Sequence, residues 1–558
     1  MTGFLKPAAL LAGGPRGMTH ALERALWHLG FSDVRVIDGR DDGGADLLAV
    51  RDRQQWVVQS KWTSLGAIDK AGVDDCERAK TRFGADKCVL ATNGTLNKTA
   101  EQRRRVLADV GIVIDTWNGR TLSAIGDRMS IDVPSRPTPR DYQRDAVASL
   151  RSDLNTEGRA LLVLATGLGK TVVGGEVIRA HLEVHPSDQV LVVAHMKELV
   201  EQLERAMWRH VTKHTQTQVL TGDRRPATFD GVTCATVESA LGLLAGGYRP
   251  GLVMVDETHH VGETGMYQRL LDACGEAPQF GVTATPWRGD KFDITDRFGR
   301  PSYAVGIDEG MAKGYLAKVD YRLFVDNLDW DFVETKSNHG YSVKDLNSRL
   351  FLPQRDEVII DRLRDAWRGV RDPRAIVFCQ TIEHAERVAD MLAKSDPAWS
   401  HAAALHSKIS SKQQRQVLLN AFRLGRVPIL TTVDVFNEGV DVPDVNIIAF
   451  MRVTHSRRIF IQQLGRGLRL RDGKEKLLAL DFVSDIRRVA AALRLRRSLL
   501  QDSAKEVLEL PLAGDHRIEF DDAAAGSLLD QWISDAADLE TAADEVKLNF
   551  PYVPASVN

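Results

Sequence analysis

Residues 161–171 read LLVLATGLGKT, an apolar strand that runs into a glycine-containing turn and then into the start of a helix. Glycines let backbone N–H groups close around phosphate oxygens, and the helix N-terminus adds a favourable dipole. The turn is therefore expected to bind the phosphates of ATP through Thr166, Gly167, Gly169 and Lys170. The hydroxyl of Thr171 is expected to hold Mg²⁺. Leu164 departs from the usual pattern, because such a loop usually begins with a small residue.

A second apolar strand downstream ends in two carboxylates. Residues 253–259 read VMVDETH, so Asp256 and Glu257 follow the strand directly. Asp256 is suited to hold Mg²⁺, and Glu257 is suited to orient and deprotonate an attacking water. Two solvated acids after a strand would be the simpler interpretation, but their position downstream of the phosphate-binding turn favours nucleotide hydrolysis.

Short apolar strands alternate with helices on both sides of these motifs. This alternation predicts parallel sheets covered by helices on both faces. The expected strands of the first sheet are Ala160–Leu164, Val190–Ala194, Val232–Ala235, Leu252–Val255 and Gln279–Thr283. Those of the second are Ala375–Cys379, Pro428–Thr432, Asn446–Phe450 and Leu477–Asp481.

Over about residues 137–482 the chain resembles a superfamily 2 helicase, with the motifs in that family's order. The resemblance implies that Gln143 reads adenine and that His259 couples nucleotide binding to strand binding. It implies nucleic-acid backbone contacts for residues 194–199 and 236–239. The stretch 436–443, FNEGVDVP, resembles motif V and contains Gly439 and Asp441. The stretch 462–469, QQLGRGLR, resembles motif VI, which makes Arg466 and Arg469 the γ-phosphate arginines and Gln462 a further candidate. The residues of these motifs resemble those of restriction-enzyme motor subunits and related DNA repair helicases more than those of RNA DEAD-box proteins, which favours DNA.

Near the N-terminus, residues 45–62 read ADLLAVRDRQQWVVQSKW and place polar side chains at the ends of two apolar strands. Side chains alternate along a strand, so Gln59 and Lys61 share one face, while Ser60 offers a backbone carbonyl. With Asp46 on the preceding strand they have the D…QxK form of a metal-dependent nuclease site. Glutamine in place of glutamate removes one negative charge from that site. A hairpin with a polar end is the alternative.

Residues 18–125 as a whole resemble the Mrr-like restriction endonuclease domain, a member of the PD-(D/E)xK nucleases. That resemblance implies that Asp46 and Gln59 bind Mg²⁺ and that Lys61 steadies the nucleophile or the transition state. Glu23, on the expected opening helix, matches an acidic position that often supplements the metal site. A solvated carboxylate on a helix face is its alternative interpretation.

The composition limits the remaining choices. With a formal net charge of −3 over 558 residues, the chain is no uniformly basic nucleic-acid coat, so DNA must meet local patches. Arg103–Arg105 and the stretch 487–497 are candidates. A solvated helix face explains the first equally well, whereas the second has arginines on several faces, which favours contact with DNA or with a lobe. The five cysteines form no Cys-x-x-Cys pair, which fits a reducing cytoplasm. No apolar stretch approaches a membrane span.

We therefore expect an α/β multidomain protein, with a restriction-endonuclease-like domain followed by two RecA-like parallel-sheet lobes. The expected segments are 1–133 for the nuclease domain, 134–139 for a proline-rich linker, 140–305 for the first lobe, 306–486 for the second lobe with a polar insertion at about 325–355, and 487–558 for a helical, acidic tail.

The expected function is an ATP-dependent DNA helicase or translocase coupled to an Mg²⁺-dependent DNA endonuclease, in restriction, anti-phage defence or DNA repair. Its expected partners are duplex or single-stranded DNA, with no membrane. In one alternative, the N-terminal domain binds DNA without cleaving it. In another, the chain is a motor subunit that docks on other proteins through its tail.

Overall fold

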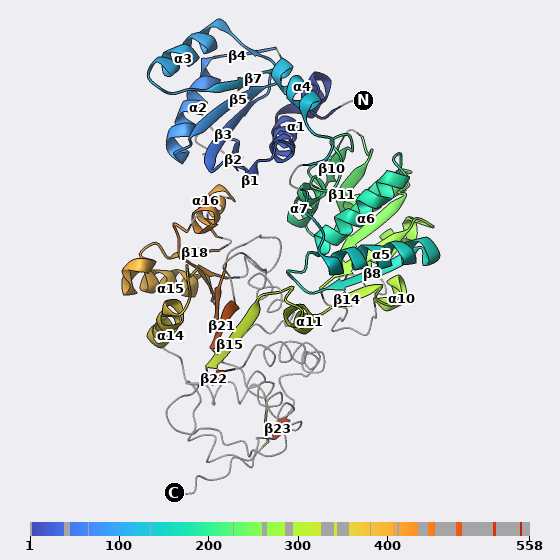
Figure 1. Ribbon diagram of the computed structural model, residues 1–558, viewed down its shortest axis with the longest axis vertical. Helices are drawn as coiled ribbons and strands as arrows, with labels where there is room; N and C mark the ends of the chain where they lie inside the picture. Colours follow the sequence, from blue (N-terminus) through green and yellow to red (C-terminus); the bar gives the residue numbers. More distant parts are fainter. Residues whose placement is uncertain are drawn as a thin grey trace. The chain divides into compact units, whose positions relative to one another are not determined.

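The computed structural model describes most of the chain in segments (Figure 1). The described residues are 3–37, 45–64, 66–133, 136–226, 228–258, 265–284, 294–324, 340–342, 356–379, 381–406, 408–409, 412–423, 425–433, 445–451, 476–482, 517–519 and 547–549. Residues 1–160, 171–281 and 411–416 form one compact unit, and the remaining residues form a second.

An N-terminal five-stranded sheet has the strand order β1-β2-β3-β5-β7. Its strands are β1 (Ser32–Val36), β2 (Leu47–Arg51), β3 (Gln54–Lys61), β5 (Lys87–Thr92) and β7 (Asp115–Trp117). The first three strands pair antiparallel, and β3, β5 and β7 pair parallel. A separate two-stranded parallel sheet is formed by β4 (Ala67–Ile68), which follows β3 in the sequence, and β6 (Thr95–Leu96), which follows β5.

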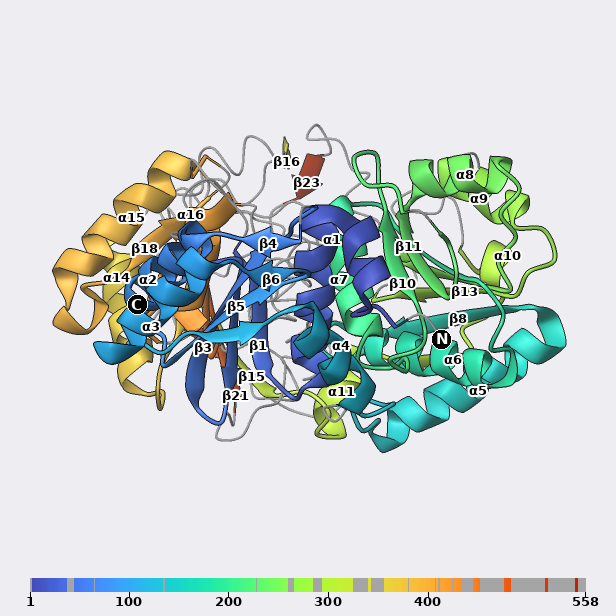
Figure 2. The ribbon, with the colours of Figure 1, turned by 90° about the horizontal axis from the view of Figure 1, so that it is seen from above.

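Helices cover both faces of this N-terminal sheet. On one face α1 (Pro7–His28) and α4 (Gly119–Arg128) pack on a core that includes Val58 and Val89. On the other face α2 (Lys70–Phe83) and α3 (Lys98–Asp109) pack on a core that includes Val57 and Leu90. Both views show α1 and α2 on opposite sides of β3 (Figures 1 and 2). Neighbouring residues of β3 therefore face different helices.

The opening helix α1, on which the sequence analysis expects Glu23, begins well before that residue, at Pro7. Gly14, with φ 64° and ψ −168°, breaks the helical geometry just before Pro15, and the helix resumes after this kink. Proline lacks the N–H that a helix interior needs, so a kink at this position is expected.

Asn97 caps α3 through its side chain, and Asp69 caps α2 in the same way.

A middle seven-stranded sheet follows, with the order β10-β11-β9-β12-β13-β8-β14. Its strands are β8 (Arg159–Leu164), β9 (Val190–Ala194), β10 (Thr217–Leu220), β11 (Val232–Thr236), β12 (Leu252–Asp256), β13 (Gln279–Thr283) and β14 (Tyr303–Val305). Helices alternate with them: α5 (Asp141–Glu157), α6 (Lys170–Val184), α7 (Lys197–Met207), α8 (Val237–Ala245), α9 (Met266–Ala273), α10 (Thr295–Phe298) and α11 (Ile307–Ala312).

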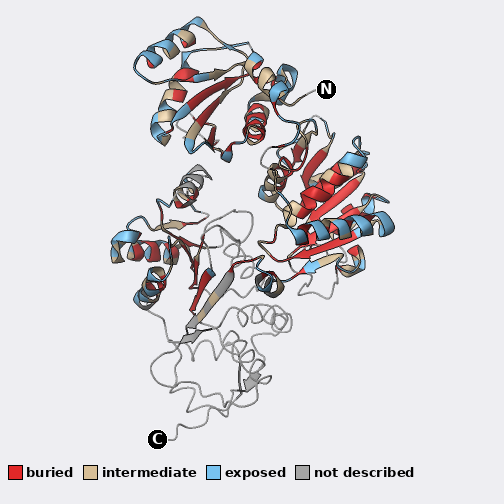
Figure 3. Ribbon diagram, viewed as in Figure 1, coloured by how far each residue is buried: buried red, intermediate tan, exposed pale blue. Residues whose placement is uncertain are grey.

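The two strands that flank β12, the central strand of the middle sheet, are buried along their whole length. All five residues of β9 and of β13 are buried, as expected for strands with helices on both faces. Figure 3 shows these buried strands in red beneath helices whose outer faces are exposed. The five strands that the sequence predicts here are all present, and β10 and β14 join them at the edges.

A C-terminal seven-stranded sheet has the order β18-β19-β17-β20-β21-β15-β22. Its strands are β15 (Lys318–Phe324), β17 (Ala375–Phe378), β18 (Ala403–Leu405), β19 (Ile429–Thr432), β20 (Ile447–Phe450), β21 (Lys476–Phe482) and β22 (Arg517–Glu519). Its helices are α14 (Asp356–Arg368), α15 (Ile382–Ser395) and α16 (Lys412–Arg423), with the short 3₁₀ turn η2 (Pro397–Trp399). All its strand pairs are parallel except β15 with β22.

The C-terminal tail contributes strands where the sequence predicts a helical segment. β22 pairs antiparallel with β15, and β23 (Lys547–Asn549) pairs with β16 (Gly340–Ser342) inside the expected insertion. These short strands find partners only in the folded chain, so local propensity does not reveal them. The expected α/β fold class with parallel sheets is confirmed. Among the helices that the structure describes, none combines the length and the apolar character that crossing a bilayer requires.

Candidate active sites

The phosphate-binding turn joins β8 to α6, as the sequence predicts. Gly167 and Gly169 have φ values of 96° and 82°, a backbone region that glycine enters without strain. Lys170 is the first residue of α6, and its Nζ lies 3.5 Å from the carbonyl oxygen of Leu164 at the end of β8. The side chain of Lys170 thus reaches back across the turn that begins at Thr166, and Thr171 is the next residue of α6. This arrangement fits a nucleotide phosphate, because free N–H groups at a helix N-terminus favour anions.

The expected acid pair follows β12 in the same sheet. Asp256 is the last residue of β12, and Glu257 has a φ of 49°. A non-glycine residue in this region carries strain, which is often found at functional sites. In the strand order, β13 alone separates β12 from β8. The carboxyl ends of parallel strands meet at one edge of a sheet, so the acids and the phosphate-binding turn follow the same edge.

Gln143, the expected adenine reader, lies in the first turn of α5 and is 6% exposed. Its Oε1 accepts a hydrogen bond of 2.9 Å from the backbone N–H of Arg140, which closes the start of the helix. The structure therefore shows Gln143 as a capping residue, and its role toward adenine stays a prediction. The remaining expected motor residues lie outside the described residues: His259, Gly439, Asp441, Gln462, Arg466 and Arg469.

The D…QxK residues meet at the ends of β2 and β3. The register pairs Leu47 with Val58, which sets Asp46 beside Gln59 one position further on. The Oδ2 of Asp46 accepts a hydrogen bond of 2.6 Å from the backbone N–H of Ser60. Gln59 is 3% exposed, and within the part of the chain that the structure describes its Oε1 has no hydrogen-bond partner.

This donor set fits a divalent cation. A buried amide oxygen without a partner is costly, and a metal ion would satisfy it. Carboxylate and amide oxygens are the ligands that Mg²⁺ prefers. The described residues hold no cluster of three or more His, Cys, Asp or Glu side chains that could bind a metal, so the site would depend on the amide of Gln59 beside the carboxylate of Asp46.

Lys61 has a partner that the sequence analysis missed. Its Nζ lies 2.6 Å from the Oδ2 of Asp75 on α2, the helix that covers its face of the sheet. The signal in the sequence was weak, because Asp75 belongs to a polar helix and is separated from the D…QxK residues along the chain. Only the packing of α2 on β3 brings it to the site.

Glu23 lies elsewhere, in contrast to the expectation that it supplements the metal site. It belongs to α1, on the face of the sheet opposite to Gln59 and Lys61. It is 2% exposed, and its Oε1 accepts a hydrogen bond of 2.6 Å from Nε of Arg205 on α7. The structure thus assigns Glu23 to a contact between α1 and α7 and not to the metal site.

The contact between α1 and α7 is built from further buried polar groups. Nε2 of His20 lies 2.9 Å from Oε1 of Glu204, which is 1% exposed. The imidazole ring of His20 also packs edge-on against Trp208, with the ring centroids 5.0 Å apart. Burial opposes the ionisation of Glu204, yet the charge and hydrogen bond of His20 lower its pKa.

Arg24 donates to the backbone carbonyls of Thr212 and Thr215, at 3.2 and 2.8 Å. Lys213 donates in the other direction, to carbonyls at the end of α4: those of Gly126, Asp127 and Met129.

Substituting Arg205 by alanine should weaken this contact strongly, since Glu23 would remain buried without its cation. Loss of one partner of a fully buried pair costs about 3–5 kcal/mol, and the cost here should be lower because Arg205 is 36% exposed. We expect a lower midpoint of thermal unfolding and faster proteolysis of the linker near Arg136. Glu201→Gln is the matched control, because Glu201 also pairs with Arg205, at 3.9 Å, but within α7. Equal effects of the two substitutions would contradict the assignment.

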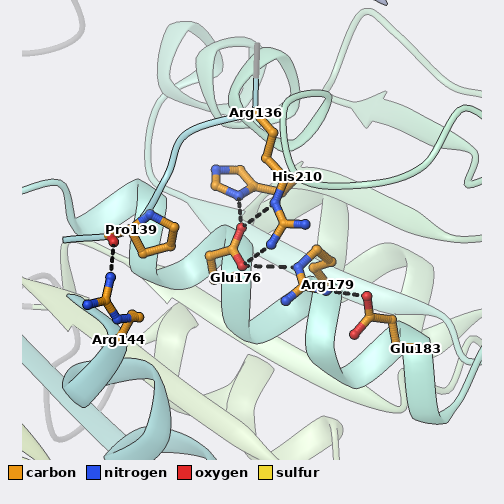
Figure 4. Close-up of polar contacts among 7 residues, drawn as sticks. All are labelled: Arg136, Pro139, Arg144, Glu176, Arg179, Glu183 and His210. Carbon is orange, nitrogen blue, oxygen red and sulfur yellow. Dashed lines mark hydrogen bonds and ion pairs between the residues drawn. The ribbon is translucent and has the colours of Figure 1, made fainter. Parts of the chain in front are cut away.

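The linker is anchored to the middle sheet by a buried ionic cluster (Figure 4). Arg136, at the linker, donates through Nε and Nη2 to both carboxylate oxygens of Glu176 on α6, at 3.2 and 2.7 Å. Arg179 donates from Nε at 3.0 Å, and Nδ1 of His210 donates at 2.9 Å. Glu176 is 4% exposed. Burial opposes its ionisation, but the hydrogen bonds of His210 and Arg136 and the charge of Arg179 lower its pKa from 4.5 to about 2.

The ionised Glu176 should therefore stabilise the fold near neutral pH. A carboxyl group with a lowered pKa contributes fully above its unfolded value of 4.5, and the contribution is lost as the pH falls toward about 2. Glu176→Gln should lower the midpoint of thermal unfolding near pH 7, and the difference from wild type should close in acid. Glu183→Gln is the control, because Glu183 also pairs with Arg179 but is 61% exposed. A difference that stays constant from neutral to acid pH would refute this.

The arginines 103–105, considered for phosphate contact, are mostly engaged within the domain. Arg103 pairs with Asp74 at 2.7 Å and with Glu77 at 2.6 Å on α2, and Arg104 pairs with Glu101 at 3.1 Å. The interpretation as solvated helix faces is favoured for this stretch. The second basic stretch, 487–497, lies outside the described residues.

Three models of protein families match the chain. Residues 10–125 match a restriction endonuclease domain, residues 136–288 match the type III restriction enzyme res subunit, and residues 354–471 match the helicase conserved C-terminal domain. The expected combination of a nuclease-type domain with the two domains of a superfamily 2 helicase is confirmed by these matches. The expected relation to restriction-enzyme motor subunits is confirmed as well.

Parts of the chain are similar in sequence or in fold to other proteins. A Schizosaccharomyces pombe protein named for a mitochondrial ATP-dependent helicase is 29% identical over 376 residues, covering 63% of this chain and 58% of that protein. The type I restriction enzyme EcoAI endonuclease subunit of Escherichia coli is 26% identical over 380 residues, covering 63% of this chain and 47% of that protein. The chain thus spans about half the length of these relatives. A fragment of a type I restriction enzyme HsdR subunit from Vibrio vulnificus has a TM-score of 0.47 at 21% identity, covering 90% of this chain and 95% of that one.

Proposed function

We propose that this chain, which joins a restriction-endonuclease domain to the two domains of a superfamily 2 helicase, hydrolyses ATP to move along DNA and cleaves DNA with its N-terminal domain. The observation that carries the proposal is the D…QxK site in the same chain as the phosphate-binding turn. Asp46 lies beside Gln59, whose buried oxygen has no hydrogen-bond partner among the described residues, and Lys61 is on the same face as Gln59. We further propose Mg²⁺ as the metal of both sites, and the cytoplasm as the place of action.

In the motor, each candidate residue has a task that its position allows. Lys170 would hold phosphate oxygens, Thr171 and Asp256 would hold the metal, and Glu257 would take the proton of the attacking water. When bound, Mg²⁺ supplies a charge that polarises the phosphoryl group. Arg466 and Arg469 would stabilise the charge that develops in the transition state. Gln143 would read adenine from the first turn of α5.

In the nuclease, Asp46 and Gln59 would hold the metal and Lys61 would steady the developing negative charge on the phosphate. The contact between α1 and α7 gives the two activities a physical connection. The helix α7 begins at Lys197, within the stretch expected to touch the nucleic-acid backbone, and the same helix carries Arg205 against α1. Restriction or anti-phage defence is the proposed biological role, with DNA repair as the second candidate.

One measurement tests the proposal. Purified protein is incubated with plasmid and linear DNA, modified and unmodified, with Mg²⁺ and with or without ATP, while cleavage and ATP hydrolysis are followed together. We expect DNA-stimulated ATP hydrolysis and metal-dependent cleavage. Robust ATP hydrolysis without cleavage of any substrate would instead favour the alternative in which the N-terminal domain only binds DNA. A larger native assembly in size-exclusion chromatography would favour a motor subunit.

A further inference from the structure

The ion pair between Lys61 and Asp75 places a second carboxylate at the candidate nuclease site. Nζ of Lys61 and Oδ2 of Asp75 are 2.6 Å apart, and the two side chains are 34% and 18% exposed. The pair is therefore partly shielded from water. Shielding strengthens the attraction between the two charges compared with a pair on an open surface. Asp75 also accepts a hydrogen bond from Arg78 through its other oxygen, Oδ1, so both of its oxygens have cationic partners.

The helix that carries Asp75 is held firmly against β3. The residues Val73, Cys76 and Ala79 of α2 are fully buried in the core beneath it. A Cβ at Gly72 would lie only 3.4 Å from Cγ of Lys61, so the helix backbone packs directly on the stem of the lysine. Asp75 thus approaches Lys61 from a rigid element, as a residue that fixes a side chain should.

The charges of the site explain why such a residue is needed. Gln59 is neutral, so on β3 itself the ammonium of Lys61 has no carboxylate two residues away to hold it. Asp46 is directed to the backbone N–H of Ser60. Asp75 supplies a negative charge from the neighbouring helix, on the face of the sheet that Gln59 and Lys61 share. An opposite charge at this distance attracts the ammonium of Lys61 and restricts its position.

We propose that Asp75 is a positioning residue of the nuclease site, which holds the ammonium of Lys61 in place of the carboxylate that Gln59 lacks. The proposal rests on the nuclease function proposed above. It assigns Asp75 no contact with DNA or metal. It predicts that Asp75 acts through Lys61 and that a carboxylate at position 59 can take over its task.

The test compares Asp75→Asn with three related variants. Asp75→Asn should lower kcat for cleavage about 10–100-fold, the usual effect of losing an orienting partner, with little change in KM for DNA. Asp75→Glu should restore part of the rate, and Gln59→Glu should restore part of it in the Asp75→Asn background. Asp74→Asn is the matched control: Asp74 precedes Asp75 on α2 but pairs with Arg103, so cleavage should stay at the wild-type level. Equal losses in both Asn variants, or no rescue by either glutamate, would overturn the proposal.

A second readout does not depend on cleavage. Acylation of the Lys61 amine by an activated ester, followed by peptide mass spectrometry, should be several-fold faster in Asp75→Asn than in wild type and unchanged in Asp74→Asn. An unchanged acylation rate in Asp75→Asn would refute the positioning role even if the nuclease is active. If the wild-type protein cuts no DNA while the acylation rate rises as expected, the nuclease function fails and the ion pair stands.

Discussion

Replacing Lys170 by alanine is expected to lower DNA-stimulated ATP hydrolysis roughly 100- to 1,000-fold, which is the usual effect of removing one donor to the developing transition-state charge. Lys170 begins α6 directly after the glycines with positive φ, and its ammonium reaches back across the turn to Leu164. No other residue at the start of α6 carries a positive charge, so a neighbour cannot replace it. The release of phosphate in the presence of DNA is the measurement.

The same variant separates the motor from the nuclease. Lys170→Ala should retain metal-dependent cleavage that needs no ATP and should lose any cleavage that requires movement along DNA. Lys313→Ala is a suitable control, because Lys313 is 52% exposed and pairs with the nearby Glu309. Wild-type ATP hydrolysis in Lys170→Ala would show that the turn at 166–171 does not bind the nucleotide.

Replacing Lys61 by alanine is expected to abolish DNA cleavage, with a loss of roughly 100- to 1,000-fold or more, while ATP hydrolysis persists. Lys61 is the only basic side chain of β3, and it ends the strand two residues after Gln59. Loss of its ammonium removes the cation that β3 places on the same face as Gln59. Cleavage and ATP hydrolysis are measured on the same preparation, so a folding defect in the motor would be detected.

A lysine on α2 provides the control for this second experiment. Lys80 donates to the backbone carbonyl of Asp86 at 3.0 Å, away from the D…QxK residues, so Lys80→Ala should cut at the wild-type rate. If Lys61→Ala still cuts like wild type, the nuclease lies elsewhere in the chain. If neither the wild-type protein nor Lys61→Ala cuts DNA although both hydrolyse ATP, the N-terminal domain is better described as a DNA-binding adaptor.

The strands and motifs with a local signal could be predicted from the sequence. β9 and β13 have the bounds that their apolar runs indicate, and the glycine turn before Lys170 lies where its spelling places it. Edge strands were missed, among them β10 and β18, because short edge strands carry a weak apolar pattern. The kinked first half of α1 was missed because Gly14 and Pro15 interrupt its periodicity.

The sequence by itself determined the order of the domains, the phosphate-binding turn, the acid pair and the D…QxK pattern, since each is encoded by neighbouring residues whose spacing fixes the geometry. The tertiary structure alone decided which distant side chains meet. Glu23 joined Arg205 instead of the metal site because α1 covers the opposite face of the sheet from Gln59. Asp75 came to Lys61 because α2 packs on the face that Lys61 occupies. Such contacts depend on how helices cover a sheet, and no periodicity within one segment records that choice.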